Sequence, residues 1–263
     1  TIYQLEPDVK DAPGALRDAS AARLLARLAT GGARRGSTTD TGRLDEAEDF
    51  LLRLRSILHL ERGRNLNGLT HELQEKVAAL FGSAEDQPRH QVEALMSTYF
   101  HHARIISRSL VTSIKLLERS PGAAPTTVGN NLELWGDGIR FADGTRASLR
   151  PRTWLNAFEA ALDAGVSVSD QVLTCIERHV DRYSPEQFFP ATAERDLLLR
   201  VLRPRPGLYA RLSEMHASGL LGRMFPEFQK VYCRVIRDFY HKYTVDEHTL
   251  LTIRTIERLC APT

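Results

Sequence analysis

The chain has few cysteines, almost no excess of one charge and no long apolar run. Its three cysteines, Cys175, Cys233 and Cys260, are far apart and form no Cys-x-x-Cys pair. Such a scattered, odd set argues against a disulfide framework or a zinc site, and it suits reduced thiols in a cytoplasmic protein. We therefore expect a cytoplasmic location.

Charge and hydropathy exclude two further classes. The 35 basic and 33 acidic residues give a net charge of +2, so no general field attracts nucleic acid or an anionic membrane. No apolar stretch approaches the length needed to cross a bilayer, and no signal-peptide pattern opens the chain. We expect neither nucleic acid nor membrane as a partner. At 263 residues the chain can bury the core of one large or two modest domains.

Apolar residues recur at helical spacing through most of the sequence. The clearest case is 89–118, where Val92, Tyr99 and Ile106 belong to a stripe that predicts the longest helix. The pattern predicts helices over 16–28, 44–62, 70–81, 89–118, 152–164, 169–182, 191–202, 207–218, 225–239 and 246–260. The glycine-rich stretch 31–42 reads as a loop, and Ser169 and Asp246 as helix N-caps.

One region favours β-structure. Leu132–Trp135 and Gly138–Phe141 flank a Gly-Asp turn, which predicts a small hairpin between helical halves. Trp135 and Trp154 are expected to anchor the core. The fold class is therefore mainly α: a helical bundle with a small β-hairpin insertion near residues 132–148.

Three blocks of the sequence resemble the bifunctional PII uridylyltransferase/uridylyl-removing enzyme family. They occur in the family's order and span nearly the whole chain. The blocks are Leu5–Asp18; Arg55–Leu60 with Gly63-Arg64 and Gln74; and Met215-His216, Gly219–Arg223, Pro226–Phe228 and Tyr243–Thr249. The sequence departs from the family at Ala15, where a second glycine is usual, and the loop 30–43 is its own.

The resemblance implies a domain order of nucleotidyltransferase, helical domain and HD hydrolase, followed by two small ligand-sensing domains. Residues 1–15 would be the tail of the nucleotidyltransferase core and 16–203 the helical domain. Residues 204–263 would be the start of a truncated all-α HD-type domain. We expect an internal piece of a larger enzyme, inactive by itself, whose parent uridylylates and deuridylylates the PII signal protein with UTP and a divalent metal, Mg or Mn.

Uridylyl transfer needs carboxylates that hold metal ions against the nucleotide phosphates. The resemblance implies a glycine-serine turn followed by an Asp-x-Asp pair for most of this, and no such combination occurs here. Glu6 or Asp8 is a candidate third carboxylate, and Lys10 a candidate phosphate ligand. The alternative is that both acids are solvated beside a turn.

Arginines follow in the next block. Arg55 and Arg64 are candidates to reach the triphosphate from the helical domain, and the alternative is a solvated helix face with ion pairs. The sequence leaves both interpretations open.

By resemblance, His248 matches the first metal-binding histidine of an HD hydrolase, whose metal activates water against a phosphodiester. A metal needs several convergent ligands, and no His-Asp pair follows His248. His241 is expected to pack or hydrogen-bond. The adjacent His101-His102 pair is not expected to share an ion, because neighbouring helical side chains point about 100° apart.

Two other functions remain possible. One is a helical scaffold or protein-interaction module without chemistry. The other is a relative of glutamine synthetase adenylyltransferase, which shares the helical domain but has no HD domain after it, so Tyr243–Thr249 argues against it.

Overall fold

A computed structural model describes residues 4–29, 38–63, 66–81, 88–117, 125–135, 138–148, 150–234 and 243–260. The chain divides into two compact units, Thr1–Arg119 with Cys233–Glu247 and Ser120–Tyr232 with His248–Thr263. Helices dominate both, so the predicted mainly α class with a small β-insertion is confirmed. The family's domain boundaries inferred above stay predictions. Among the described helices, none combines the length and apolar character of a membrane span.

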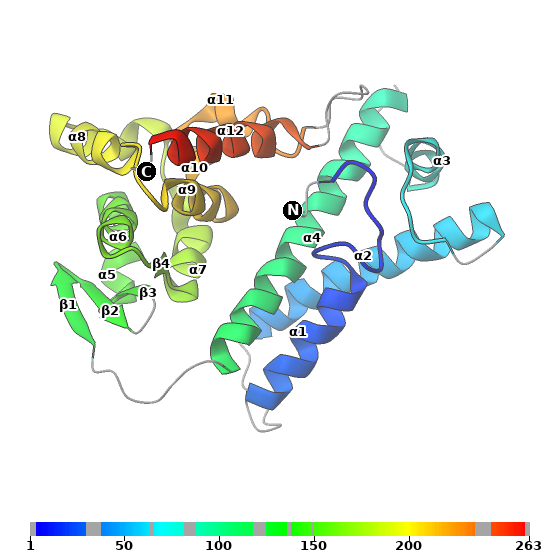
Figure 1. The fold of residues 1–263 in the computed structure, drawn as a ribbon, viewed down its shortest axis with the longest axis horizontal. Helices are drawn as coiled ribbons and strands as arrows, with labels where there is room; N and C mark the ends of the chain where they lie inside the picture. The colour runs from blue at the N-terminus through cyan, green and yellow to red at the C-terminus, as the bar shows by residue number, and fades with distance from the viewer. Residues whose placement is uncertain are drawn as a thin grey trace. The chain divides into compact units, whose positions relative to one another are not determined.

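The first unit is built around one long helix. Its helices are α1 (Leu16–Ala29), α2 (Thr38–Arg62), α3 (His71–Phe81) and α4 (Pro88–Leu117). Each of α1, α2 and α3 contacts α4, and Figure 1 shows α1 beside α4 and α2 crossing it. Val92, Met96 and Ala103 are fully buried on α4, as the helical spacing predicted. Burial of this stripe holds the unit together.

The start of α2 corrects one prediction. The sequence pattern predicts a loop over residues 38–42, but α2 already begins at Thr38, six residues before Leu44, the first residue of the predicted apolar stripe. A helix extends through polar residues when its apolar part is anchored, since propagation costs little once a helix is nucleated. The rest of the predicted loop, 31–37, lies outside the described residues.

The second unit combines short helices with a four-stranded sheet. Its helices are α5 (Gly144–Ser148), α6 (Pro151–Ala164), α7 (Asp170–His179), α8 (Thr192–Val201), α9 (Leu208–Ala217), α10 (Leu220–Met224), α11 (Pro226–Gln229) and, from His248 onward, α12 (Val245–Cys260), with 3₁₀ turns η1 (Val180–Arg182) and η2 (Pro185–Phe188). The strands, in sheet order, are β1 (Thr126–Gly129), β2 (Leu132–Trp135), β3 (Gly138–Phe141) and β4 (Ser167–Val168).

The predicted hairpin is present as β2 and β3, which pair antiparallel from Leu132 opposite Phe141 to Trp135 opposite Gly138. The sequence pattern missed β1 and β4. All four residues of β1 are exposed, so the strand has no apolar side to detect, and β4 is two residues long. Residues 144–148, which the sequence pattern places in the hairpin region, form α5.

Helix ends follow local chemistry in the second unit. Pro151 starts α6, and Gly165 ends it in the left-handed conformation, with φ of +66°. The Ser169 hydroxyl accepts a hydrogen bond from the N–H of Val172, so the predicted N-cap of α7 is confirmed.

Two helix predictions near the C-terminal end are wrong. The 225–239 stretch is not one helix, because α11 ends at Gln229 and Cys233 takes a left-handed conformation with φ of +50°, which an α-helix cannot contain. Residues 235–239 lie outside the described part. Asp246 is not the N-cap of α12, because the helix already begins at Val245. The Asp246 carboxylate instead accepts the N–H of Cys233 at 3.0 Å.

Glu257 joins α12 to the start of α9. Its two carboxylate oxygens accept the N–H groups of Gly207 at 2.7 Å and Tyr209 at 2.8 Å. A carboxylate at a helix N-terminus satisfies free N–H groups and complements the helix dipole.

Glu257→Ala is therefore expected to lower the free energy of unfolding by about 1–2 kcal/mol, as for loss of a helix cap. Thermal unfolding followed by circular dichroism measures the loss. Glu257→Gln keeps one carbonyl oxygen as an acceptor and should lose about half as much. An unchanged melting temperature for Glu257→Ala would contradict the role of this contact.

Candidate functional site

The N-terminal segment, which carries three of the predicted site residues, is paired with the chain that leads into α3. The N–H of Val9 donates to the carbonyl of Asn67, and the N–H of Leu69 donates to the carbonyl of Pro7, both at 2.8 Å. These bonds form an isolated antiparallel bridge between Asp8 and Gly68. The segment is thus held in an extended conformation by main-chain pairing, as in a two-stranded ladder.

Side chains add to this attachment. Gln74 of α3 is fully buried, and its amide nitrogen donates to the carbonyls of Leu5 at 2.6 Å and Leu69 at 3.0 Å. Its amide group therefore connects the two paired segments. A buried hydrogen bond of this kind resists exchange with water, since breaking it leaves polar groups unsatisfied.

Both candidate acids contact main-chain N–H groups. Glu6 is exposed, and its Oε1 accepts the N–H of His71 at 2.8 Å, which caps the start of α3. Asp8 is half-buried, and its Oδ1 accepts the N–H groups of Lys10 and Asp11, each at 2.8 Å. This is the Asx-turn pattern of an aspartate that shapes a turn. Both bonds use Oδ1, so Oδ2 is the Asp8 atom that could meet a cation.

Asp8 also lies near a buried phenol. Tyr99 of α4 is fully buried, and its hydroxyl has no hydrogen-bond partner among the described residues. Burial, reinforced by the negative charge of Asp8, raises the pKa of the Tyr99 hydroxyl. The phenol therefore stays protonated at neutral pH.

Arg55 lies on α2 and contacts one of the two paired segments through Asn67. Its Nε donates to Oδ1 of Asn67 at 2.8 Å, and Nε2 of His59 lies 3.3 Å from the same oxygen. Arg55 and His59 thus share one helix face, as their spacing predicted. Arg64, the other candidate, lies outside the described residues. Asn67 thus connects Arg55 to the segment that carries Asp8, because its main-chain carbonyl accepts the N–H of Val9.

His248 is the fourth residue of α12, at the end of its first turn, and its side chain is exposed. Its carbonyl accepts the hydroxyl of Thr252 at 3.0 Å. His241 lies outside the described residues. Exposure leaves the imidazole accessible, and its assignment as a metal ligand stays a prediction.

Metal sites require several ligands that converge on one point. Within the described ranges, no three His, Cys, Asp or Glu side chains are grouped closely enough to hold an ion. The His101 and His102 rings are 5.6 Å apart and edge to face, and His102 stacks on Phe50 at 4.5 Å. Burial, with a smaller contribution from His101, lowers the pKa of His102 to about 4, so it is neutral at pH 7. Asp8 or His248 could each contribute one ligand, but the described residues do not form a complete metal site.

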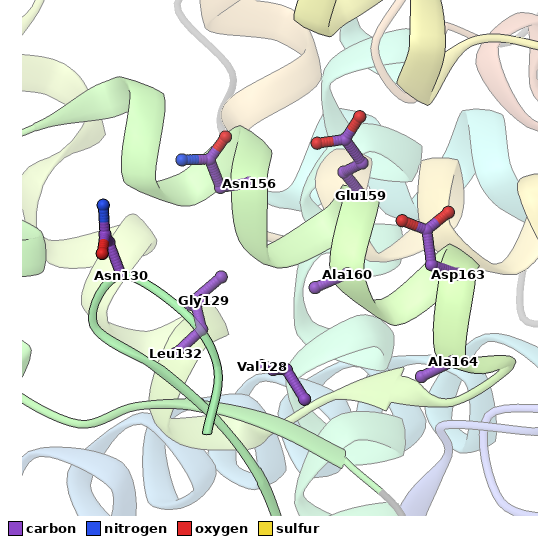
Figure 2. A pocket seen from close by; sticks show the side chains of 9 residues that line it. All are labelled: Val128, Gly129, Asn130, Leu132, Asn156, Glu159, Ala160, Asp163 and Ala164. Atoms are coloured by element: carbon purple, nitrogen blue, oxygen red, sulfur yellow. The ribbon is translucent and has the colours of Figure 1, made fainter. Parts of the chain in front are cut away.

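The second unit contains a cavity of about 460 Å³ between the β1–β2 turn and α6. Figure 2 shows Asn156, Glu159 and Asp163 along the helix that lines it. Glu159 is paired with Arg200, and Asp163 with Arg205. Because both carboxylates already have cationic partners, we assign no ligand to this cavity.

Sequence comparison identifies the relatives of this chain. Residues 1–112 match the family model described as GlnD PII-uridylyltransferase. The bifunctional uridylyltransferase/uridylyl-removing enzyme of Thiobacillus denitrificans is 32% identical over 272 residues, covering 98% of this chain and 32% of the relative. The enzyme of the same name from Methylococcus capsulatus is 30% identical over 280 residues (98% and 31%), and that of Bordetella pertussis 28% over 276 residues (100% and 32%).

These matches place the chain among relatives of the uridylyltransferases. More particularly, it is related over its whole length to the bifunctional uridylyltransferase/uridylyl-removing enzymes, and the resemblance predicted from the sequence is confirmed. The chain spans about a third of the length of the curated relatives it matches. No solved structure matches it.

Sequence reasoning missed one residue of this site. Asn67 belongs to no periodic pattern or motif in the sequence. Its role depends on contacts with Arg55 and His59 of α2, a helix that ends before Asn67 in the chain. The sequence points to Gln74 only through the family resemblance. Its position in the buried stripe of α3 was the available signal, since a fully buried amide requires partners.

Proposed function

We propose that this chain is the central part of a bifunctional enzyme that transfers uridylyl groups from UTP to the PII signal protein and removes them again. The transfer half would use a divalent metal, Mg or Mn, and the removal half would be a metal-dependent HD hydrolase that cleaves the phosphodiester. We place the enzyme in the cytoplasm, in keeping with its three cysteines, none of which forms a disulfide. The observation that carries the proposal is similarity to these enzymes along the whole chain.

The proposal gives the predicted residues distinct tasks. Asp8, through Oδ2, would add a carboxylate to the transferase site, with Glu6 next to it. Lys10 and Arg55 would face the nucleotide phosphates, to which lysine and arginine are suited by charge and by bidentate geometry respectively. His248 would add one ligand to the hydrolase metal. The described residues do not supply the remaining ligands of either metal.

The reading frame around this chain tests the proposal directly. Upstream, a Gly-Ser turn with an Asp-x-Asp pair is expected, and downstream a His-Asp pair. The protein encoded by that frame should transfer label from UTP to PII and release it again. Stop codons at both ends of the present sequence would instead favour a helical scaffold without chemistry.

The 263-residue chain alone should show neither activity. Each site would have at most a few of its ligands, and a metal needs several that converge. Incubation of the purified chain with labelled UTP, Mg²⁺ or Mn²⁺ and PII, followed by gel autoradiography, measures transfer; release of label from uridylylated PII measures removal. Turnover above the protein-free control would contradict this expectation.

A further inference from the structure

Asn67 connects the candidate cation of the first unit, Arg55, to the segment that carries the candidate acid Asp8. Its main-chain carbonyl accepts the N–H of Val9, the residue after Asp8, and its side-chain Oδ1 accepts Nε of Arg55. One residue therefore contacts Arg55 and the segment that carries Asp8, each through a different atom. A displacement of Asn67 would therefore move both Arg55 and the segment that carries Asp8.

The bond from Arg55 also fixes the direction of the guanidinium. Because it uses Nε, the planar group is oriented by Asn67, and Nη1 and Nη2 are the amino groups that would meet a phosphate. His59, at 3.3 Å from the same oxygen, limits the side-chain rotation of Asn67. The half-buried position of all three residues restricts competition from water.

The rest of the segment is fixed independently of Asn67. Glu6 caps α3, Gln74 holds Leu5, and the first N–H groups of α1 donate to the carbonyls of Val9 and Lys10. Loss of the Asn67 side chain should therefore shift the Asp8 region locally and leave the unit folded. Because the unit stays folded, a loss of activity in this variant would report the position of the site residues and not a loss of folding.

We propose that Asn67 is a positioning residue of the transferase site, holding the Pro7–Val9 segment and the Arg55 guanidinium in register with each other. This inference rests on the proposed function. It assigns to Asn67 no contact with substrate. Its effect is on orientation, and misplacement of a reacting group by about 1 Å can cost about a hundredfold in rate.

The test uses the protein encoded by the complete reading frame. Asn67→Leu removes Oδ1 and should lower kcat/KM for uridylyl transfer about 10- to 100-fold, a loss comparable to that caused by removing the hydrogen-bond partner of a metal ligand. The uridylyl-removing rate of the same protein should stay unchanged. Hydrogen–deuterium exchange over residues 5–11 should become faster. Asn67→Asp keeps an acceptor oxygen for Arg55 and should restore transfer to within about threefold of wild type.

Asn156→Leu is the matched control, because Asn156 is another half-buried asparagine but lies on α6 of the second unit. It should leave transfer, and exchange over residues 5–11, unchanged. Transfer by Asn67→Leu within threefold of wild type overturns the inference, and so does an equal fall of both activities, which marks a structural role. If the wild-type protein transfers no uridylyl group at all, the proposed function itself fails.

Discussion

Replacing Gly14 by alanine should destabilise the first unit by about 4 kcal/mol, near the upper end of single substitutions. Gly14 has φ of +75°, in the left-handed region that costs other residues about 1 kcal/mol. An added Cβ would lie 2.3 Å from the carbonyl oxygen of Ala103 on α4. The N-terminal segment would have to move away from α4 to relieve this clash. Urea unfolding of the chain, followed by circular dichroism, measures the effect.

Gly63 supplies the control. It also has a left-handed conformation, with φ of +61°, but among the described residues, its chain neighbours apart, no heavy atom lies within 4 Å of the position of an added Cβ. Gly63→Ala should therefore lower the free energy of unfolding only by the cost of the left-handed backbone conformation, about 1 kcal/mol. Equal losses at the two positions would show that close contact with Ala103 is unimportant.

Trp154→Ala should lower the stability of the second unit by about 4 kcal/mol, since truncation of a buried aromatic side chain leaves a large cavity. Trp154 is fully buried on α6. Its ring meets Tyr183 edge to face with centroids 5.4 Å apart, and Phe188 lies 6.2 Å away. Guanidinium unfolding followed by fluorescence is informative, because the chain has two tryptophans and Trp135 remains as the reporter.

Trp135→Ala provides the comparison within the same unit. Trp135 was expected in the core, but it is half-buried: its indole N–H donates to Glu133, and Arg140 lies 4.9 Å from its ring. That prediction is wrong, because the side chain lies beside its neighbours on the sheet and is not enclosed by the core. Its loss should cost about 1 kcal/mol, the value of an exposed cation–π contact with some packing. A cost equal to that of Trp154→Ala would contradict this difference.

Much of the helical framework could be predicted because its signals are local. The apolar stripe of α4 recurs every three or four residues, and burial of Val92, Tyr99 and Ile106 confirms it. The hairpin of β2 and β3 follows from alternating residues around a short turn. Ser169 caps α7 with an atom three residues from its partner.

The parts that were missed depend on distant neighbours. Helix 225–239 looked continuous by spacing, but the left-handed Cys233 interrupts it and its N–H donates to Asp246. The two tryptophans look alike in sequence and differ in burial only because of what surrounds them. Glu6 and Asp8 could be recognised as candidates, but their partners could not.

The sequence by itself determined that the chain is mainly helical, where most helices lie and which enzyme family it resembles, because periodicity, caps and motifs are properties of residues close together in the chain. Only the tertiary structure decided that Asn67 connects Val9 to Arg55 and that Gln74 joins Leu5 to Leu69. These contacts bridge up to 69 residues, and they form because helix packing brings polar groups together that must be satisfied once water is removed.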